Sequence, residues 1–135
     1  MSMKVIQSSG KRKSAIARGV VKSGKGQIRI NHVPLDLYQP EIARFRIQEV
    51  LEVATHDKLQ KVDIIIKVKG GGISSQTDAV RICLAKAIQK YVGTKTIDRT
   101  IREYDSSLLS GDSRRVEPKK FGGTKARARR QKSFR

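Results

Sequence analysis

Residues 61–72 read Lys-Val-Asp-Ile-Ile-Ile-Lys-Val-Lys-Gly-Gly-Gly, and this stretch decides the fold class. Every second residue in it is a branched apolar residue, namely Val62, Ile64, Ile66 and Val68. A period of two is typical of a strand with one buried face. Ile65 indicates that the second face is partly covered as well. The run of glycines ends the strand in a turn.

The residues after the glycines change to a helical period. The spacing predicts a helix from about Thr77 to Val92, with a buried face at Val80, Leu84, Ala87, Ile88 and Tyr91. Ser75, Gln76 or Thr77 is expected to cap its start, and Gly93 to end it in a left-handed conformation.

The residues before the central strand contain further elements. Ile28 and Ile30 predict a half-buried strand over 27–31, which a glycine-containing turn joins to a strand at 16–21. A helix is predicted to follow Pro40, with its apolar face at Ala43, Ile47, Val50, Leu51 and Ala54. A short helix is expected over 98–104, and no periodicity remains after Leu109. Strands and helices together predict an α+β domain.

The composition is strongly basic and excludes several classes of protein. The chain has 135 residues, 30 of them Lys or Arg and 12 Asp or Glu, for a formal net charge of +18. The longest apolar run has three residues, 64–66, far short of the roughly 18 that a membrane span needs. No apolar block follows Met1, and Cys83 is the single cysteine, so neither a secretory signal nor a disulfide framework is expected. We expect a soluble intracellular protein with a polyanionic partner.

The positive charge is concentrated at the two ends of the chain. Residues 1–25 have a net charge of +7, residues 26–113 of +2 and residues 114–135 of +9. Like-charge blocks at a terminus are typical of arms that lie along nucleic acid. The last 22 residues have too few apolar side chains to form a core, so we expect a domain over 1–113 and a tail over 114–135 that is disordered when free.

The sequence contains no constellation typical of an enzyme or a metal site. His32 and His56 are far apart in sequence, and Cys83 lies on the buried side of the predicted helix. Gly70-Gly71-Gly72 is compatible with a turn that needs positive φ and with a backbone contact to a nucleic-acid phosphate. It lacks the Gly-Lys-Ser/Thr ending of a nucleoside-triphosphate loop. We therefore expect no catalytic residue, cofactor or metal.

Four blocks in order resemble the family of the ninth protein of the small ribosomal subunit, in its archaeal form. They are residues 10–18 (Gly-Lys-Arg-Lys-Ser-Ala-Ile-Ala-Arg), 24–31 (Gly-Lys-Gly-Gln-Ile-Arg-Ile-Asn), 68–81 with its glycine turn, Gln76, Ala79 and Arg81, and 112–135. Ser75 and Ser113 stand where the family often has Gly and Pro, so the turn and the start of the tail are expected to differ locally.

The resemblance implies a small β-sheet with helices on one face, similar to the second domain of the fifth small-subunit protein, with an extended basic tail. It implies a non-enzymatic structural constituent of the cytoplasmic ribosome, bound to ribosomal RNA and neighbouring proteins in the subunit head, and no membrane partner. The tail is expected to reach the peptidyl-site tRNA through Lys132 and Arg135. The expected RNA-binding residues are Lys11, Arg12, Lys13, Arg18, Gly70, Gly71, Gly72, Gln76, Arg81, Arg114, Arg115, Lys119, Lys120, Lys125, Arg127, Arg129 and Arg130.

Two other functions stay open on the residues alone. One is a free nucleic-acid-binding protein that compacts DNA or chaperones RNA. The more distant one is an enzyme that acts on phosphorylated substrates through residues 70–72.

Overall fold

A five-stranded mixed sheet forms the centre of the computed structural model, which describes residues 4–55, 57–131 and 133. The strand order is β1 (Ile6–Arg12), β2 (Ala15–Ser23), β5 (Val62–Lys69), β3 (Ile28–Ile30) and β4 (Val33–Pro34). Neighbouring strands are antiparallel except β3 and β5, which are parallel. The predicted central strand 62–69 is thus confirmed, and it lies in the middle of the sheet.

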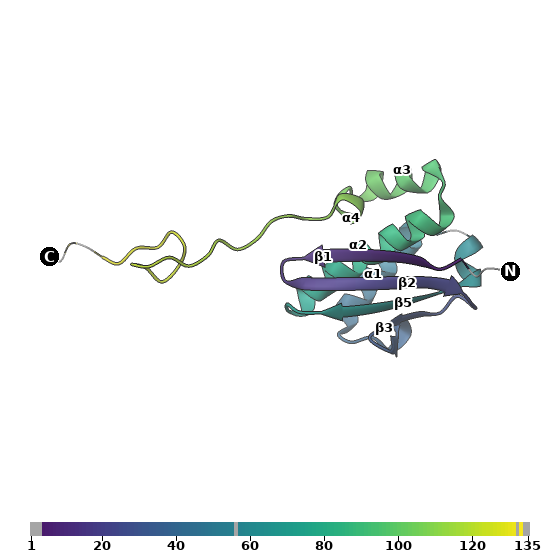
Figure 1. Ribbon diagram of the computed structural model, residues 1–135, viewed down its shortest axis with the longest axis horizontal. Coiled ribbons are helices and arrows are strands. Elements are labelled where there is room, and N and C mark those ends of the chain that lie inside the picture. Colours follow the sequence, from purple (N-terminus) through teal and green to yellow (C-terminus); the bar gives the residue numbers. More distant parts are fainter. Residues whose placement is uncertain (1–3, 56, 132, 134–135) are drawn as a thin grey trace.

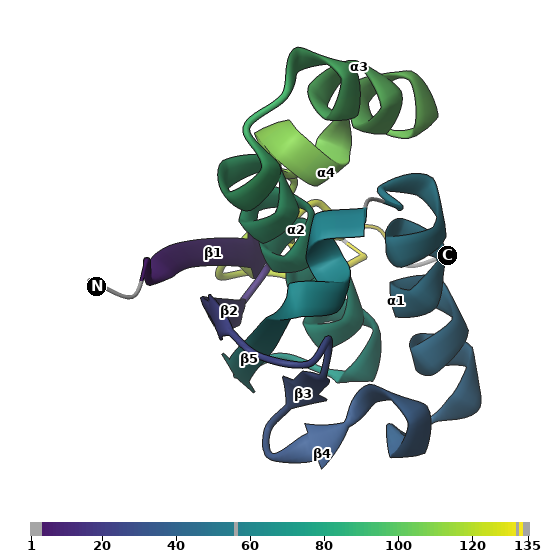
Figure 2. The same ribbon diagram turned by 90° about the vertical axis from the view of Figure 1, so that its right-hand side faces the viewer.

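The helices cover one face of the sheet. α1 (Glu41–Val53) and α2 (Ile73–Val92) both lie on this face, and Figure 2 shows them on the same side of the strands. α3 (Lys95–Tyr104) and α4 (Ser107–Ser110) pack against α2, and two 3-10 turns, η1 (Leu35–Leu37) and η2 (Asp57–Lys61), flank α1 in the sequence. The predicted α+β fold, with a small sheet and helices on one of its faces, is confirmed.

The core is aliphatic and lies between the sheet and α1 and α2. The alternating residues of β5 are buried as predicted, and they pack against Ile47 of α1 and Leu84 and Ile88 of α2. Cys83 is fully buried, as expected of a small core residue, and burial raises the pKa of its thiol. None of the helices in the part of the chain that the structure describes is long and apolar enough to cross a membrane.

Strand β1 was not predicted from the sequence, and the reason is the close approach of α2. The residues of β1 that face α2 are Ser8 and Gly10, so the strand has no apolar alternation. A Cβ at Gly10 would lie 2.6 Å from the backbone nitrogen of Cys83, and one at Gly19 would lie 2.8 Å from its Sγ. Only glycine fits at these two positions. Lys11, Arg12, Lys13, Arg18 and Lys22 therefore belong to a β-hairpin of the domain and do not form a separate arm.

Two helices begin earlier than predicted. α2 begins at Ile73 rather than Thr77, and its N-cap is Gly72, with no side-chain cap. Thr77 is buried inside the helix, where its hydroxyl donates to the Ile73 carbonyl at 2.8 Å. α3 begins three residues before the predicted Asp98, and Gly93 ends α2 with a φ of 67° as expected. Thr77 was predicted as a capping residue because of its side-chain chemistry, but in the fold it is a buried core residue.

Candidate nucleic-acid interface

The face of the sheet opposite the helices carries a set of cations. Because side chains alternate along a strand, the residues that do not face the helices project from this side. Figure 1 looks onto this face, with β1, β2 and β5 in front of α1 and α2. We call its exposed basic residues the sheet-face cations: Lys11, Arg18, Lys22, Arg29, Lys67 and Lys69.

The strand register places like charges beside one another on this face. Arg18 lies opposite Lys67 in the β2–β5 pair, and Lys11 and Lys69 lie on either side of Ile16 in the same row. Like charges directly opposite one another destabilise a sheet. Among the described residues none of these four cations forms an ion pair. The fold therefore tolerates a repulsion that a bound anion would relieve.

Asp63 is the carboxylate on this face, and its oxygen is already used by the backbone. Asp63 Oδ1 accepts hydrogen bonds from the backbone nitrogens of Gln27 at 3.0 Å and Lys25 at 2.9 Å. These bonds, the one from Gln27 first, lower the pKa of Asp63. Asp63 thus orders the turn between β2 and β3. It lies opposite Lys22 in the β2–β5 pair and its charge attracts Arg29, but among the described residues it forms no ion pair with either cation.

The tail starts beside the β1–β2 hairpin. Arg12 turns toward the helices, where its Nε lies 3.6 Å from Asp112 Oδ2 and its Nη1 donates to the Arg114 carbonyl at 2.9 Å. Asp112 also accepts from Arg114 Nη2 at 2.7 Å, and this side-chain bond is the main reason that the pKa of Asp112 lies far below its usual range. The side chains of Arg12 and Asp112 are only 14% and 18% exposed. This tail anchor sets where the tail leaves the domain.

The tail itself has no helix or strand over its described residues, 114–131 and 133. It extends away from the domain, as the yellow-green segment in Figure 1 shows. Arg127 pairs with Glu117 at 2.8 Å, and the Arg130 nitrogen donates to the Gly122 carbonyl at 3.0 Å, so residues 117–130 form a loop. Its remaining basic side chains are exposed on a narrow, extended chain.

Comparison with known proteins identifies the family. Residues 10–135 match the family described as ribosomal protein S9/S16. The chain is 47% identical to the small ribosomal subunit protein uS9 of the archaeon Methanothrix thermoacetophila, over 98% of this chain and all of that protein. It is 49% identical to the protein of the same name from Candida albicans and 47% to that from Debaryomyces hansenii, with full coverage of both chains. The chain belongs to the ribosomal protein S9/S16 family. The resemblance read from four sequence blocks is confirmed, and this is a family of ribosomal proteins, not of enzymes.

The basic block of this S9/S16 chain at residues 11–13 divides among three environments. Lys11 projects from the uncovered face, Arg12 belongs to the tail anchor, and Lys13 is exposed in the hairpin turn with a φ of 53°. Arg18 joins Lys11 on the uncovered face. Arg12 is therefore a positioning residue for the tail in addition to its expected role in RNA binding.

Arg81 and Gln76, two further expected RNA-binding residues, also make internal contacts. Arg81 is 11% exposed and lies 3.5 Å from Glu49 and 4.0 Å from Asp78, and Asp78 in turn pairs with Arg46 at 2.6 Å. Gln76 donates its side-chain amide to the Gly70 carbonyl at 3.1 Å. Arg81 thus connects the middle of α2 to α1, and Gln76 connects the start of α2 to the glycine turn.

The backbone of the glycine turn at residues 70–72 agrees with the prediction of a turn that needs positive φ. Gly70 and Gly71 have φ values of 80° and 67°, and a Cβ at Gly70 would lie 2.5 Å from the Ser14 carbonyl oxygen. Gly72 is exposed, with nothing near its added Cβ. The turn packs against Ser14 and Ala15 at the end of the β1–β2 hairpin.

The basic tail residues of the prediction are exposed where they are described. They are Arg114, Arg115, Lys119, Lys120, Lys125, Arg127, Arg129 and Arg130. Lys132 and Arg135, predicted to approach tRNA, lie outside the described residues.

Sequence reasoning did not include Lys22, Arg29, Lys67 and Lys69 among the candidate interface residues. The signal was present for Arg29, Lys67 and Lys69, because each alternates with buried residues in a predicted strand. Lys22 was assigned to the turn after the strand predicted at 16–21, whereas β2 extends to Ser23. The prediction for the central strand considered only the buried residues. The polar residues between them also lie on one face of the strand.

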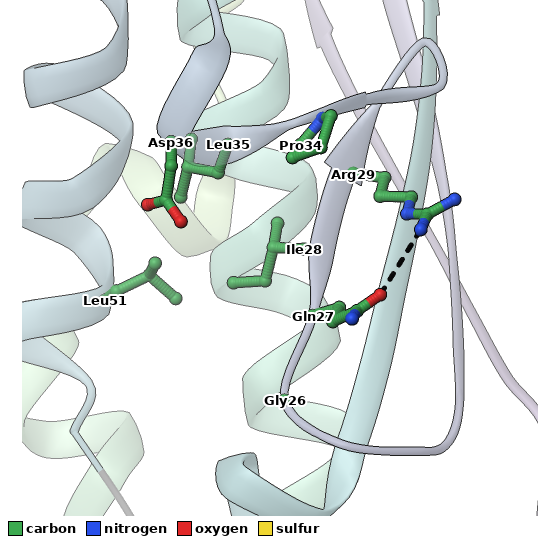
Figure 3. A pocket seen from close by; sticks show the side chains of 8 residues that line it. All are labelled: Gly26, Gln27, Ile28, Arg29, Pro34, Leu35, Asp36 and Leu51. Atoms are coloured by element: carbon green, nitrogen blue, oxygen red, sulfur yellow. Dashed lines mark hydrogen bonds between the residues drawn. The ribbon is translucent and has the colours of Figure 1, made fainter.

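A hollow lies beside β3. It has a volume of about 340 Å³ and is lined by Gly26, Gln27, Ile28, Arg29, Pro34, Leu35, Asp36 and Leu51. Figure 3 shows Arg29 bonded to Gln27, at 3.4 Å, on the opposite side from Asp36. Within the described part of the chain no three His, Cys, Asp or Glu side chains form a group that could hold a metal ion. His32 is exposed in the β3–β4 turn, and His56 lies outside the described residues.

Proposed function

We propose that this S9/S16 chain is a structural constituent of the small ribosomal subunit, in the cytoplasmic ribosome, and binds ribosomal RNA through the sheet-face cations and the tail. The observation that carries the proposal is the uncovered basic face, where Arg18 and Lys67 lie opposite one another without a counter-charge among the described residues. Phosphate groups would supply that charge. Each neutralised phosphate releases counterions, so binding weakens as salt rises.

The chemistry of the face favours phosphates over bases. The apolar side chains between the cations are Ile16, Val20 and Ile65, which are aliphatic. Single-stranded RNA is usually held by aromatic side chains on which bases stack. Lysine and arginine on a rigid sheet contact the backbone and position it without reading sequence. The face is therefore suited to the phosphates of a helical RNA segment.

Salt dependence tests this role of the sheet face. For a small-subunit ribosomal RNA transcript, we expect Lys67→Gln with Lys69→Gln to make the negative slope of log K against log salt shallower by about 1.4 to 1.8. The control, Lys95→Gln with Arg102→Gln on α3, removes the same charge from another surface and should change the slope much less. Equal changes in the two double variants would show that only net charge matters and would overturn the assignment.

We further propose that the end of the tail contacts the tRNA in the peptidyl site. Support comes from the family resemblance and from the direction of the tail, which leaves the domain at the tail anchor and extends away from it (Figure 1). Lys132→Ala with Arg135→Ala should weaken tRNA retention in the peptidyl site while subunit assembly stays intact. Loss of assembly together with normal tRNA affinity in the assembled subunits would contradict this contact.

A further inference from the structure

The outer side of α1 differs from the rest of this basic protein. Glu41, Ile42, Phe45, Gln48, Glu49 and Glu52 recur at intervals of one, three or four residues and form one stripe, which we call the α1 outer stripe. Ile42 is 74% exposed and Phe45 54% exposed. A shallow hollow beside them is lined by Phe45, Arg46, Gln48, Glu49 and Glu52.

The fold does not require these apolar side chains on the surface. α1 packs onto the core through Ala43, Ile47 and Val50 on its opposite side. Grouped exposed apolar residues with a polar rim are typical of an interaction site. Arg44 limits the freedom of the ring at the centre of the stripe, because its guanidinium lies 5.3 Å from the Phe45 ring centroid and also pairs with Glu41 at 3.1 Å.

The charge of the stripe selects the class of partner. Three of the chain's 12 acidic residues lie on it. Arg81 partly neutralises Glu49 from the α2 side, whereas Glu52 forms no ion pair among the described residues. RNA is repelled by carboxylates, so the same charge that disfavours RNA favours a lysine- or arginine-rich protein segment.

We propose that the α1 outer stripe binds a basic segment of another protein of the small subunit. An apolar side chain of that segment packs against Ile42 and Phe45, and its cations pair with Glu49 and Glu52. This inference rests on the proposed function only in placing the partner within the subunit. The sheet face and the α1 outer stripe then lie on opposite sides of the sheet, one for RNA and one for protein.

Photo-crosslinking in the assembled subunit identifies what covers the stripe. Benzoylphenylalanine at position 45 should crosslink to a lysine- or arginine-rich peptide of one other small-subunit protein, mapped by mass spectrometry. The same probe at Tyr104 of α3, which is 43% exposed, is the control for accidental proximity. Crosslinks to ribosomal RNA, to many proteins equally, or to none would overturn the proposal.

A competition experiment tests the charge and the apolar contact together. Phe45→Ser with Glu52→Lys is mixed with an equal amount of native chain during reconstitution from ribosomal RNA and the other small-subunit proteins. We expect its share in the subunits to fall about tenfold, the effect of losing one interface anchor residue. The control, Tyr104→Ser with Glu103→Lys, makes the matched changes on α3 and should keep its share.

The same competition on ribosomal RNA alone separates this proposal from the proposed function. Without other proteins, the α1 double variant should bind at least as well as native chain, because it has gained positive charge. A deficit on RNA alone would assign the stripe to RNA and overturn the proposal. Failure of the Lys67 and Lys69 variant to change RNA binding would instead contradict the sheet-face assignment and leave this result unaffected.

Discussion

The sheet face and the tail carry similar numbers of cations on very different backbones. Six basic side chains project from the uncovered face, and eight lie in residues 114–131 of the tail. The strands hold the first set at positions defined by register, whereas the second set lies on a chain with few internal contacts. Folding has already ordered the sheet, whereas we predict that the tail is disordered when free and loses conformational freedom when it binds. We infer that the sheet face positions the protein on RNA and that the tail adapts to the path available to it.

Deleting residues 114–135 should have the largest effect on RNA binding. If about half of the tail's basic residues contact phosphate, the deletion flattens the salt slope by about 3 to 5 units. The domain's thermal unfolding should change little, because the tail contributes no core residue. A slope that does not change, measured by filter binding over a salt series, would show that the sheet face carries the whole electrostatic contribution.

Gly19→Val should damage the sheet face while leaving the tail intact. The new side chain would collide with Cys83 Sγ and Ser8 Oγ, so we expect the free energy of unfolding to fall by about 1–3 kcal/mol. Chemical denaturation measures this change. Gly72→Val is the control, because an added Cβ there meets nothing within 4 Å. Equal losses in both variants would contradict the close approach of α2 to the sheet.

Lys67→Gln should change stability and RNA binding in opposite directions. Removing one charge of the Arg18–Lys67 pair relieves repulsion, so the free protein should gain about 0.2–0.5 kcal/mol in unfolding free energy. For RNA binding, the negative slope of log K against log salt should become shallower by about 0.7 to 0.9. Lys119→Gln in the tail should also make this slope shallower, without stabilising the domain. A destabilised Lys67→Gln domain would show that this lysine has a structural role.

The tail anchor should persist into acid. Arg114, and then Arg12, hold the pKa of Asp112 below its usual value, so the contribution of the anchor is present at neutral pH and is lost as pH falls below about 4 through the lower folded-state pKa. An NMR titration of the Asp112 carboxyl group should give a midpoint below that of a free peptide. Arg114→Ala should raise this midpoint more than Arg12→Ala. A midpoint at the peptide value in the native chain would mean that the anchor is absent in solution.

Much of the fold was predictable because β5 and α1 each follow a single period. The glycine turn was predictable as well, since Gly70 and Gly71 stand where strand and helix periods meet. β1 was not, because its buried positions are Ser8 and Gly10, which carry no hydrophobic signal. Both ends of the chain are also strongly basic, yet one pairs into the sheet and the other does not.

The amino-acid sequence by itself determined the central strand, the aliphatic core, the family and the concentration of charge in residues 114–135. These properties depend on local order and composition, which the chain carries in any conformation. Only the tertiary structure decided that Arg18 lies opposite Lys67, that Arg12 and Asp112 meet across 100 residues of chain, and that Ile42 and Phe45 lie outside the core. Those facts depend on register and on how closely α2 approaches the sheet, and neither is a property of any one segment.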